Sequence, residues 1–570
     1  MSFLQDIFGR LDAAGDVVIL QEFPGGETQP TASLQKASAT GQELLEMVAK
    51  ARAFLAGKDL EKGDRCALLA HNGIEWVAMD LAIMAEGLIV VPLYARQAPA
   101  ELVTMMKDCS PALICCGDTG LRDGIAQNWP EAPPQVLFED VFDRADSAEG
   151  RPLSDALQEA QRMGHPVLSD SDPVTIIYTS GTSGEAKGVV LNSGNIGHML
   201  GCTSGRLDAL MENRAGQDRV FHYLPFCFAG SWIMLLTCLL RGSLLIMNTD
   251  LGKLARDMRA ASPDYFLNVP ALLERMRKAV DEQLWKTSGL ALASYRRAKG
   301  AWMRKQDGHA SRLDSMWLAW ANSLIFPTIR RRMIGPHLKA LICGSAPLNV
   351  ETQLFFQMLG IRVLQVYGLT ETTAICTMDD PRQVEPGRVG PAISGVEMKL
   401  GENDEIVVRG PNIFPGYWNR PQETAKVSRD GWFYTGDQGE VDASGNWRII
   451  GRIKNLIILG SGHNVAPEPI EDEVLRNLTG AQQVVLVGNG RGYISAIVTG
   501  EVTREQVQTA LDVVNGTLPH YKQIRAFHVH TEPFSIDNGV LTANGKLKRD
   551  VIAAQMRGEI EEMYQVKQAV

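Results

Sequence analysis

The sequence predicts an α/β protein with a large N-terminal domain and a small α+β C-terminal domain. Three observations predict this class. The chain has 570 residues, more than a single hydrophobic core usually serves. Short apolar runs bounded by Gly, Ser or Pro alternate with stretches of helical apolar spacing. A turn-rich stretch ends near residue 451, and a new α/β pattern begins after it.

The alternating elements can be located individually. Gly41–Ala56 has the apolar spacing of a helix, and residues 63–72 follow it as an expected strand. Further buried strands are expected at residues 174–178, 341–343 and 363–366. We therefore place an N-terminal domain at residues 1–450, with a helical insertion at 284–339, and a C-terminal domain at 451–570.

The composition is that of a folded globular protein, with 45% hydrophobic and 21% charged residues. A net charge of -10 disfavours nucleic acid as a partner. The nine cysteines form no CxxC pair or zinc-spaced cluster, which favours a reducing, cytoplasmic setting over a disulfide framework. The N-terminus lacks the features of a signal peptide. The most apolar stretch, residues 229–240, is too short to span a bilayer, so we expect buried core there.

Residues 284–339 form a basic, partly amphipathic region of expected helix. Trp302, Trp317 and Trp320 lie among its many Lys and Arg residues. Two interpretations stay open for this region. It is either a solvated helical cap over the core, or a site of peripheral attachment to an anionic membrane surface, where an apolar substrate could be collected.

A loop rich in Ser, Thr and Gly is expected directly after the strand at 174–178. Its glycines allow turns that expose backbone N–H groups, its hydroxyls add donors, and Lys187 adds a cation, which together suit a polyphosphate. The residues expected to bind phosphate are Thr179, Ser180, Gly181, Thr182, Ser183, Gly184 and Lys187. The loop is not a Walker A motif, because Ala186 precedes the lysine and Gly188 follows it. Taken alone, such a stretch is also typical of a surface turn.

Five further segments follow this loop in order. They read GSAPL at 344–348, QVYGLTET at 365–372, YTGD at 434–437, GRIK at 451–454 and NGK at 544–546. Together with the loop they resemble the adenylate-forming superfamily, which includes acyl-CoA synthetases, nonribosomal peptide adenylation domains and firefly luciferase. The resemblance implies ATP and Mg²⁺ as cofactors. It also implies that the N-terminal domain has two α/β subdomains and a small β-rich subdomain, and that the C-terminal domain is mobile.

The resemblance assigns nucleotide-binding roles to several residues. Tyr367, with Gly368 beside it, stacks on adenine, Thr370 holds a phosphate or the acyl-adenylate, and Glu371 is a hard oxygen ligand for Mg²⁺. A carboxylate, Asp437, accepts hydrogen bonds from the ribose, and Arg452 donates to the ribose or a phosphate. The small residues at the adenine pocket are Gly344, Ser345 and Ala346, although a plain tight turn is the alternative for them.

Lys546 is the residue that the resemblance favours for the first half-reaction, beside Lys187, Thr370 and Glu371. A carboxylate must approach an anionic α-phosphate there, and a fixed cation lowers that barrier as pyrophosphate leaves. For the second half-reaction, Lys454 stands at the family's hinge position. The loop of Gly460, Ser461 and Gly462 leaves room for the pantetheine arm of coenzyme A.

Residues 225–232 match the segment that lines the acyl pocket in relatives. Phe226, Phe228 and Trp232 make this segment apolar, and it holds no aspartate to pair a substrate ammonium, which disfavours an amino acid substrate. Trp232 occupies the position of a gate residue in some long-chain enzymes, although ordinary core is the alternative. The amino-acid sequences at residues 464–471 and 541–549 resemble those of long-chain fatty acyl-CoA synthetases, so a medium or long-chain fatty acid is the expected substrate.

The expected function is therefore an ATP-dependent acid:CoA ligase, cytoplasmic or peripheral at a membrane. An acyl-AMP ligase that loads an acyl carrier protein is the main alternative, and activation of an aromatic or other apolar acid is another. A luciferase-like oxygenase and a binding module without catalysis are less favoured. The binding module would require loss of Lys187, Glu371, Asp437 or Lys546, and all four are present.

Overall fold

The computed structural model describes residues 2–23, 38–143, 168–180, 186–212, 214–285, 289–535, 538–542 and 545–565. The chain divides into two compact units. The first comprises Met1–Thr179, Lys187–Glu397 and Arg409–Lys426, and the second comprises Ser180–Ala186, Met398–Val408 and Val427–Val570. The second unit thus takes strands that precede the domain boundary expected near residue 451, and that boundary stays a prediction.

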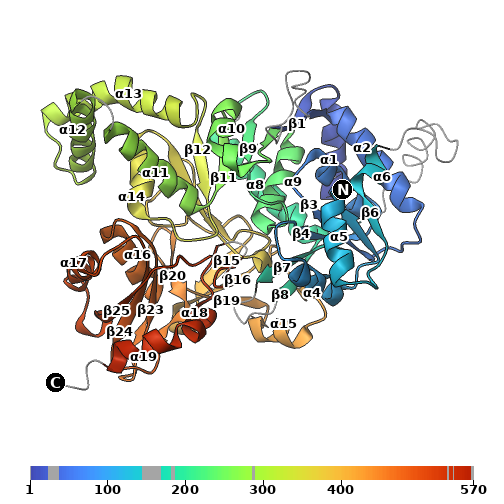
Figure 1. Cartoon of the computed structure of the whole chain (residues 1–570). Helices are drawn as coiled ribbons and strands as arrows, with labels where there is room; N and C mark the ends of the chain where they lie inside the picture. The colour runs from blue at the N-terminus through green and yellow to red at the C-terminus, as the bar shows by residue number, and fades with distance from the viewer. Residues whose placement is uncertain are drawn as a thin grey trace. The chain divides into compact units, whose positions relative to one another are not determined.

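A seven-stranded sheet forms one part of the first unit, with the strand order β17-β8-β7-β4-β3-β5-β6. Figure 1 labels its strands β3, β4, β6, β7 and β8. In chain order its strands are β3 (Arg65–Ala70), β4 (Ile89–Tyr94), β5 (Leu113–Cys116), β6 (Gln135–Leu137), β7 (Pro173–Ser180), β8 (Ala186–Asn192) and β17 (Gly416–Tyr417). The helices between them are α2 (Gly41–Ala56), α3 (Ile74–Ala85), α4 (Pro99–Cys109), α5 (Thr119–Asn128) and α6 (Phe138–Phe142). The expected helix at Gly41–Ala56 and the expected strands within 63–72 and 174–178 are confirmed.

An eight-stranded sheet forms the rest of the first unit, with the order β14-β13-β12-β11-β9-β10-β1-β2. Its strands are β1 (Val18–Glu22), β2 (Ser38–Thr40), β9 (Arg219–His222), β10 (Leu244–Met247), β11 (Tyr265–Asn268), β12 (Ala340–Cys343), β13 (Arg362–Tyr367) and β14 (Thr377–Met378). Its helices are α1 (Phe3–Ala14), α8 (Ser193–Met211), α9 (Ala229–Arg241), α10 (Leu254–Ala261), α11 (Pro270–Trp285), α12 (Gly289–Gln306), α13 (Arg312–Met333) and α14 (Val350–Met358). The last helix of the unit, α15, spans Pro421–Val427.

Two helices of the first unit are buried on nearly every side. In α3 every residue from Ile74 to Ala85 except Glu75 is buried, and in α9 the buried residues include all from Ser231 to Leu239. A helix that is apolar all round belongs in a core. The expectation of buried core at residues 229–240 is therefore confirmed. Among the described residues no helix is long and apolar enough to cross a membrane.

The second unit combines two small sheets and a hairpin. A five-stranded sheet, which lies largely in this unit, contains β15 (Glu397–Leu400), β16 (Glu405–Arg409), β18 (Ser428–Arg429), β19 (Trp432–Val441) and β20 (Trp447–Arg452). The C-terminal part contains the hairpin β21 (Ile457–Ile458) and β22 (Asn464–Val465), and the sheet of β23 (Ala481–Val487), β24 (Ile494–Gly500) and β25 (Ile524–His530). Its helices are α16 (Pro467–Asn477), α17 (Arg504–Asn515), α18 (Arg549–Gln555) and α19 (Arg557–Gln565).

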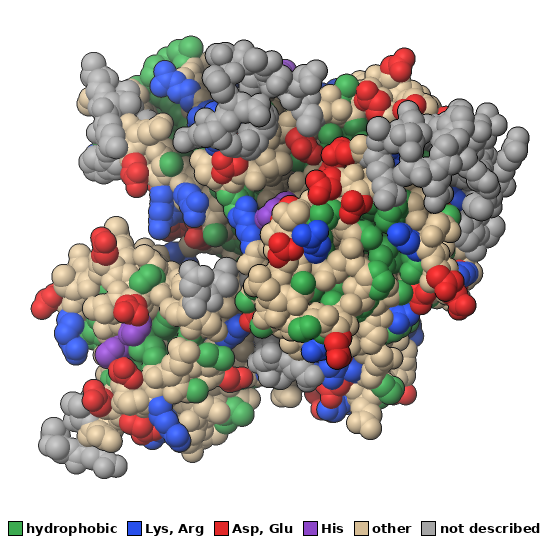
Figure 2. Space-filling model, turned by 45° about the vertical axis from the view of Figure 1, so that its right-hand side comes forward, with side chains coloured by type: hydrophobic (Ala, Val, Ile, Leu, Met, Phe, Trp, Pro, Cys, Tyr) green, Lys and Arg blue, Asp and Glu red, His purple; other side chains and the backbone are tan. Residues whose placement is uncertain are grey.

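The surface carries charges of both signs. Figure 2 shows acidic and basic side chains interspersed over the face that it draws. The predicted fold class, a mixed α/β chain with a large N-terminal domain and a separate C-terminal domain, agrees with the observed architecture.

Candidate functional site

The segments expected to bind adenine leave two neighbouring strands at the same edge of the eight-stranded sheet. Strands β12 and β13 pair in parallel, with Cys343 opposite Gln365, so their carboxyl ends lie together. A Cβ atom on Gly344 would lie 2.6 Å from Cγ2 of Val366, which only glycine avoids. Gly344 and Tyr367 are therefore brought close together, as the sequence predicts.

The residues that follow these strands have unusual backbone conformations. Ser345 has a φ of 72°, and both it and Ala346 are exposed at the strand end. A Cβ atom on Gly368 would collide with the carbonyl oxygen of Ala374, whose own φ is 86°. Backbone held in the left-handed region costs free energy and is common at functional sites.

Thr370 and Glu371 lie in a 3-10 turn, Thr370–Thr372, that directly follows this segment. A residue distant in sequence holds this turn in place, because the backbone N–H of Phe414 donates to the carbonyl oxygen of Glu371 at 2.9 Å. The hydroxyl of Tyr417 donates to Oε1 of Glu371 at 2.8 Å. The partly buried carboxylate of Glu371 is thus oriented by an aromatic side chain from β17.

The same aromatic side chain contacts the expected phosphate-loop lysine. Nζ of Lys187 lies 5.2 Å from the ring centroid of Tyr417. The contact follows from strand pairing, since β17 pairs antiparallel with β8 and places Tyr417 opposite Val189. Lys187 and Glu371 are far apart in sequence, yet Lys187 contacts the ring of Tyr417 and Glu371 accepts a hydrogen bond from its hydroxyl.

Lys187 also forms an ion pair with a carboxylate of α15. Its Nζ lies 2.7 Å from Oε2 of Glu423, and the hydrogen bonds from Lys187 and Lys426 lower the pKa of Glu423 to about 2. Sequence reasoning missed both Glu423 and Tyr417. Gly416 and Pro421 mark turns there, but nothing in the sequence indicates a contact between residues separated by 236 positions.

The phosphate loop itself is described only at its ends. Thr179 is partly buried near the end of β7, and Lys187 follows the start of β8. The expected phosphate-binding residues Gly181, Thr182, Ser183 and Gly184 lie outside the described residues, as does the side chain of Ser180. Their role stays a prediction.

Asp437 and Arg452 are direct partners in the second unit. They face each other across the antiparallel pair β19–β20, and Nε of Arg452 lies 2.8 Å from Oδ1 of Asp437. Asp437 is buried, and its backbone N–H donates to the hydroxyl of Thr435 at 3.0 Å. The two residues expected to hold the ribose are therefore fixed side by side.

Two lysines of the same unit are also expected site residues, and one of them, Lys454, lies close to this pair. Partial burial, together with the nearby charges of Arg452 and Lys546, lowers the pKa of Lys454 to about 8, although the carboxylates of Asp437 and Asp550 oppose that shift. The side chain of Lys546 is exposed, and its backbone N–H donates to the hydroxyl of Thr542 at 3.1 Å. The second unit thus gathers four residues that the sequence assigns to the nucleotide and the hinge.

The expected coenzyme A loop joins β21 to β22. Gly460, Ser461 and Gly462 are exposed, and Gly462 has a φ of 82°, a conformation that favours glycine. The backbone N–H of Gly460 donates to the carbonyl oxygen of Arg491 at 2.8 Å. The loop therefore presents its backbone to solvent while its first residue is anchored to the C-terminal sheet region.

The residues expected at the acyl pocket lie between α3, β9 and α9. Phe226 is buried, with its ring centroid 4.9 Å from that of His222 and 5.1 Å from that of Trp76. Phe228 is partly buried, 5.7 Å from the ring of Tyr94. These contacts make an aromatic cluster around the segment.

Trp232 is fully buried and is held by a carboxyl group. Its Nε1 donates to Oδ2 of Asp80 at 3.0 Å, which joins α9 to α3. Asp80 is itself fully buried, and burial raises its pKa to about 7. This packing is that of a core residue, and the gating role of Trp232 stays a prediction.

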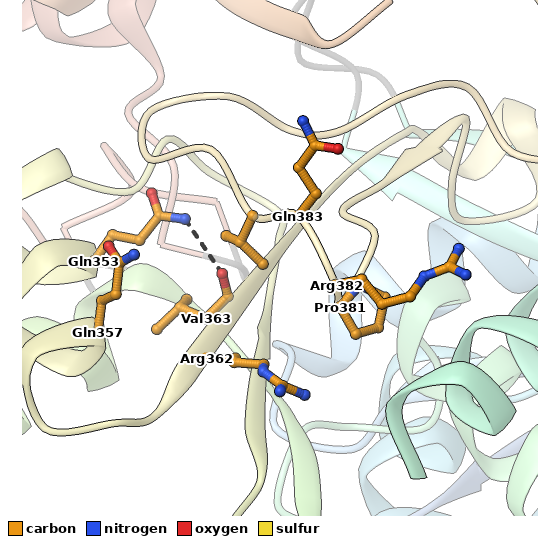
Figure 3. A pocket seen from close by; sticks show the side chains of 8 residues that line it. Gln353, Gln357, Arg362, Val363, Pro381, Arg382 and Gln383 are labelled. Carbon is orange, nitrogen blue, oxygen red and sulfur yellow. Dashed lines mark hydrogen bonds between the residues drawn. The ribbon is translucent and has the colours of Figure 1, made fainter. Parts of the chain in front are cut away.

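A pocket of about 260 Å³ lies elsewhere in the first unit (Figure 3). It is lined by Gln353, Arg362, Val363, Arg382 and their neighbours, and Gln353 donates to the carbonyl oxygen of Val363. Arg362 begins β13, whereas Tyr367 ends it, so this pocket is at the opposite end of the strand from the expected adenine site.

Comparisons with known proteins place this geometry in a family. The family model of the AMP-binding enzyme matches residues 25–418, and the model of the AMP-binding enzyme C-terminal domain matches residues 454–568. The chain therefore belongs to the AMP-binding, adenylate-forming enzymes.

Relatives include both acyl-CoA ligases and a carrier-protein ligase. The long-chain-fatty-acid–CoA ligase FadD15 of Mycobacterium bovis is 26% identical, and the match covers 92% of each chain. The chloroplastic long-chain-fatty-acid–[acyl-carrier-protein] ligase AEE15 of Arabidopsis thaliana is 25% identical, over 92% of this chain and 82% of its own. The fold resembles that of O-succinylbenzoate coenzyme A synthetase from Bacillus subtilis in complex with AMP, with a TM-score of 0.71 and 18% identity over 96% and 97% of the two chains.

Proposed function

We propose that this protein is an ATP-dependent acid:CoA ligase that works in two steps. A carboxylate and ATP give an acyl-adenylate and pyrophosphate, and the acyl-adenylate and CoA then give acyl-CoA and AMP. The observation that carries the proposal is the meeting of Lys187 and Glu371 on Tyr417, two groups of opposite charge fitted to a metal-bound polyphosphate.

The residues divide the first step between them. Lys187 binds the phosphates after they displace the carboxylate of Glu423. Phosphate and carboxylate are both anionic and compete for the same ammonium group. Lys546 stabilises the charge that develops as pyrophosphate leaves, and Thr370 orients the adenylate. Asp437 and Arg452 hold the ribose from the adjacent strands β19 and β20.

Glu371 supplies the protein ligand for Mg²⁺, which neutralises charge on the phosphates when bound. Within the described ranges no group of three or more His, Cys, Asp or Glu side chains could hold a metal ion. A single carboxylate fits Mg²⁺ in this role, because the ion usually keeps several waters and takes its other ligands from substrate phosphates. The hydrogen bond from Tyr417 fixes one oxygen of that carboxylate.

In the second step, Lys454 acts as the hinge and the loop of Gly460, Ser461 and Gly462 receives the pantetheine arm. The exposure of this loop and the positive φ of Gly462 support that role. Coenzyme A is the acceptor that we propose. The carrier-protein ligase among the relatives makes an acyl carrier protein the second candidate.

The substrate that we propose is a medium or long-chain fatty acid. Phe226, Phe228 and Trp232 keep the acyl segment apolar, and Asp80 beside it already accepts from Trp232. Burial raises the pKa of Asp80 to about 7, so it does not offer a ready negative charge to a substrate ammonium. The relatives that are named as long-chain ligases support the same choice, and an aromatic or other apolar acid is the alternative.

The test supplies the purified protein with ATP, Mg²⁺ and a series of fatty and aromatic acids, with either CoA or an acyl carrier protein as acceptor. Products are identified by mass. We expect acyl-CoA from medium or long-chain fatty acids. Acyl-adenylate without a thioester in the CoA reactions would contradict the choice of acceptor, and turnover of aromatic or short acids alone would contradict the choice of substrate. The cytoplasmic setting stays a prediction.

A Lys546→Ala variant tests the proposed adenylation residue. Loss of one preorganised cation at the transition state is expected to lower pyrophosphate exchange by roughly a hundredfold or more. ATP binding, measured by calorimetry, should change little, and Lys548→Ala, two positions along the chain, should exchange pyrophosphate at a near wild-type rate. Near wild-type exchange in Lys546→Ala would show the assignment to be wrong.

A further inference from the structure

Helix α13 packs into the first unit through one face only. Its buried residues Ala321 and Phe326 belong to the core beside the eight-stranded sheet, and Leu318 is buried as well. Figure 1 shows α12 and α13 lying together beside α11 at the margin of this unit. The helical prediction for this region is therefore confirmed over the described residues of α12 and α13.

The opposite face of α13 is apolar and exposed. Leu313, Met316, Trp320 and Leu324 are 64%, 69%, 42% and 57% exposed. Their spacing of three and four residues places them in one line along the helix, over roughly 16 Å at 1.5 Å per residue. Because an α-helix turns by about 100° per residue, this line lies on the side of α13 that faces away from Leu318 and Ala321. We call these four residues the α13 stripe.

The surroundings of the stripe are strongly basic. Residues 289–339 contain ten Lys or Arg and two Asp or Glu, in a chain whose net charge is -10. Arg331 continues the line of the stripe and is exposed, as is Arg332. Arg297 of α12 lies 5.0 Å from the ring of Trp317, and that ring packs edge-on against Trp320 at 5.2 Å. Cations thus flank the apolar side chains.

The two acidic residues do not neutralise this surface. Asp314 is buried on the inner side of α13, where Nη2 of Arg304 lies 2.5 Å from its Oδ1. Asp307 lies in the turn between α12 and α13. The exposed side of α13 therefore combines an apolar line with the positive charges of Arg331 and Arg332 at its C-terminal end.

We propose that the α13 stripe docks on an anionic lipid surface. Apolar side chains of such a helix enter the boundary between headgroups and acyl chains, while arginines meet the anionic headgroups. A second copy of this chain is a poorer occupant, because face-to-face packing of two stripes would bring two basic clusters together. The proposal concerns binding alone and does not depend on the ligase reaction.

Flotation of the full chain with vesicles tests the proposal without ATP or substrate. We expect wild-type protein to float with vesicles that contain phosphatidylglycerol, and to stay at the bottom with pure phosphatidylcholine. Raising the salt from about 0.1 M to about 0.5 M should release it, since screening shortens the reach of the arginines. Binding to both vesicle types alike, or to neither, would overturn the proposal.

Two variants separate the apolar and the basic contributions. Met316→Gln/Leu324→Gln and Arg331→Glu/Arg332→Glu should each lower vesicle partitioning by at least about tenfold. The matched controls are Val17→Gln/Val513→Gln, at exposed apolar positions elsewhere, and Lys50→Glu/Lys58→Glu, with the same charge change. Circular dichroism and thermal melting confirm that each variant is folded.

Equal loss in the controls, or none in the stripe variants, would overturn the lipid assignment. Light scattering after gel filtration tests whether a second copy of this chain covers the α13 stripe. A dimer that the Met316→Gln/Leu324→Gln variant abolishes would mean that the stripe is covered by a second copy instead.

Discussion

Tyr417 is the residue that joins the two charged groups expected to act on the phosphates. Its hydroxyl donates to Glu371 and its ring faces the ammonium of Lys187. A Tyr417→Phe variant keeps the ring and removes the hydrogen bond. Because a hydrogen bond to a charged group contributes roughly 1.5–3 kcal/mol, we expect the Mg²⁺ concentration for half-maximal adenylation to change by about tenfold, in the direction of weaker binding.

Titration of pyrophosphate exchange with Mg²⁺ measures this effect. Tyr493→Phe is the matched control, since it removes a hydroxyl that donates to the carbonyl oxygen of Met563, within the C-terminal residues. An unchanged Mg²⁺ requirement in Tyr417→Phe would mean that the hydroxyl does not orient the metal ligand.

Sequence patterns located the residues that follow a strand end and missed those that depend on strand pairing. Tyr367 and Glu371 were predictable because residues 365–372 match a motif of the adenylate-forming superfamily, in order with the other matching segments, and Lys187 because it belongs to the glycine-rich loop. Tyr417 was not, because its contact with Lys187 arises from the antiparallel pairing of β17 with β8. Pairing between distant segments leaves no local signal in a single sequence.

At the scale of elements, one hydrogen bond ties α3 to α9. The Trp232 side chain was predictable as an apolar residue, but its partner Asp80 was not, since a fully buried carboxyl cannot be recognised from helical spacing. Among the described residues, Oδ1 of Asp80 has no hydrogen-bond partner. Such a group is costly to ionise, which is why its pKa is raised.

This burial predicts a pH-dependent stability that an Asp80→Asn variant removes. The pKa of Asp80 rises from 3.8 to about 7 on folding, so the folded state holds a proton that the unfolded state releases. The stability that this proton contributes is present below pH 3.8 and is lost as the pH rises to about 7. The free energy of unfolding lost over this pH range is on the order of 4 kcal/mol.

Thermal melting between about pH 5 and pH 8 measures the difference. The wild-type midpoint should fall relative to that of Asp80→Asn as the pH rises, and the difference should level off above pH 7. Asp12→Asn, at an exposed position in α1, should track the wild type throughout. Parallel curves for wild type and Asp80→Asn would mean that Asp80 is ionised in the folded protein.

At the scale of the whole molecule, the two proposed half-reactions draw on different parts of the second unit. We propose Lys546 for adenylation and the loop of Gly460, Ser461 and Gly462 for thiol transfer, and the family model of the C-terminal domain begins at residue 454. Lys454 lies in the 3-10 turn Ile453–Asn455 that enters this domain. A change of backbone torsion at Lys454 would reorient the domain between the two steps.

A Lys454→Pro variant therefore separates the half-reactions. Proline fixes φ near -65°, so we expect thioester formation to fall by at least about tenfold while pyrophosphate exchange stays within about twofold of wild type. Lys454→Ala removes the same charge but keeps torsional freedom, and it should retain both activities to within a few-fold. Rapid-quench assays of each half-reaction supply the measurement. Wild-type thioester formation in Lys454→Pro would place the hinge elsewhere, and equal loss in Lys454→Ala would assign the effect to the ammonium group, whose pKa is lowered to about 8, instead of to the backbone.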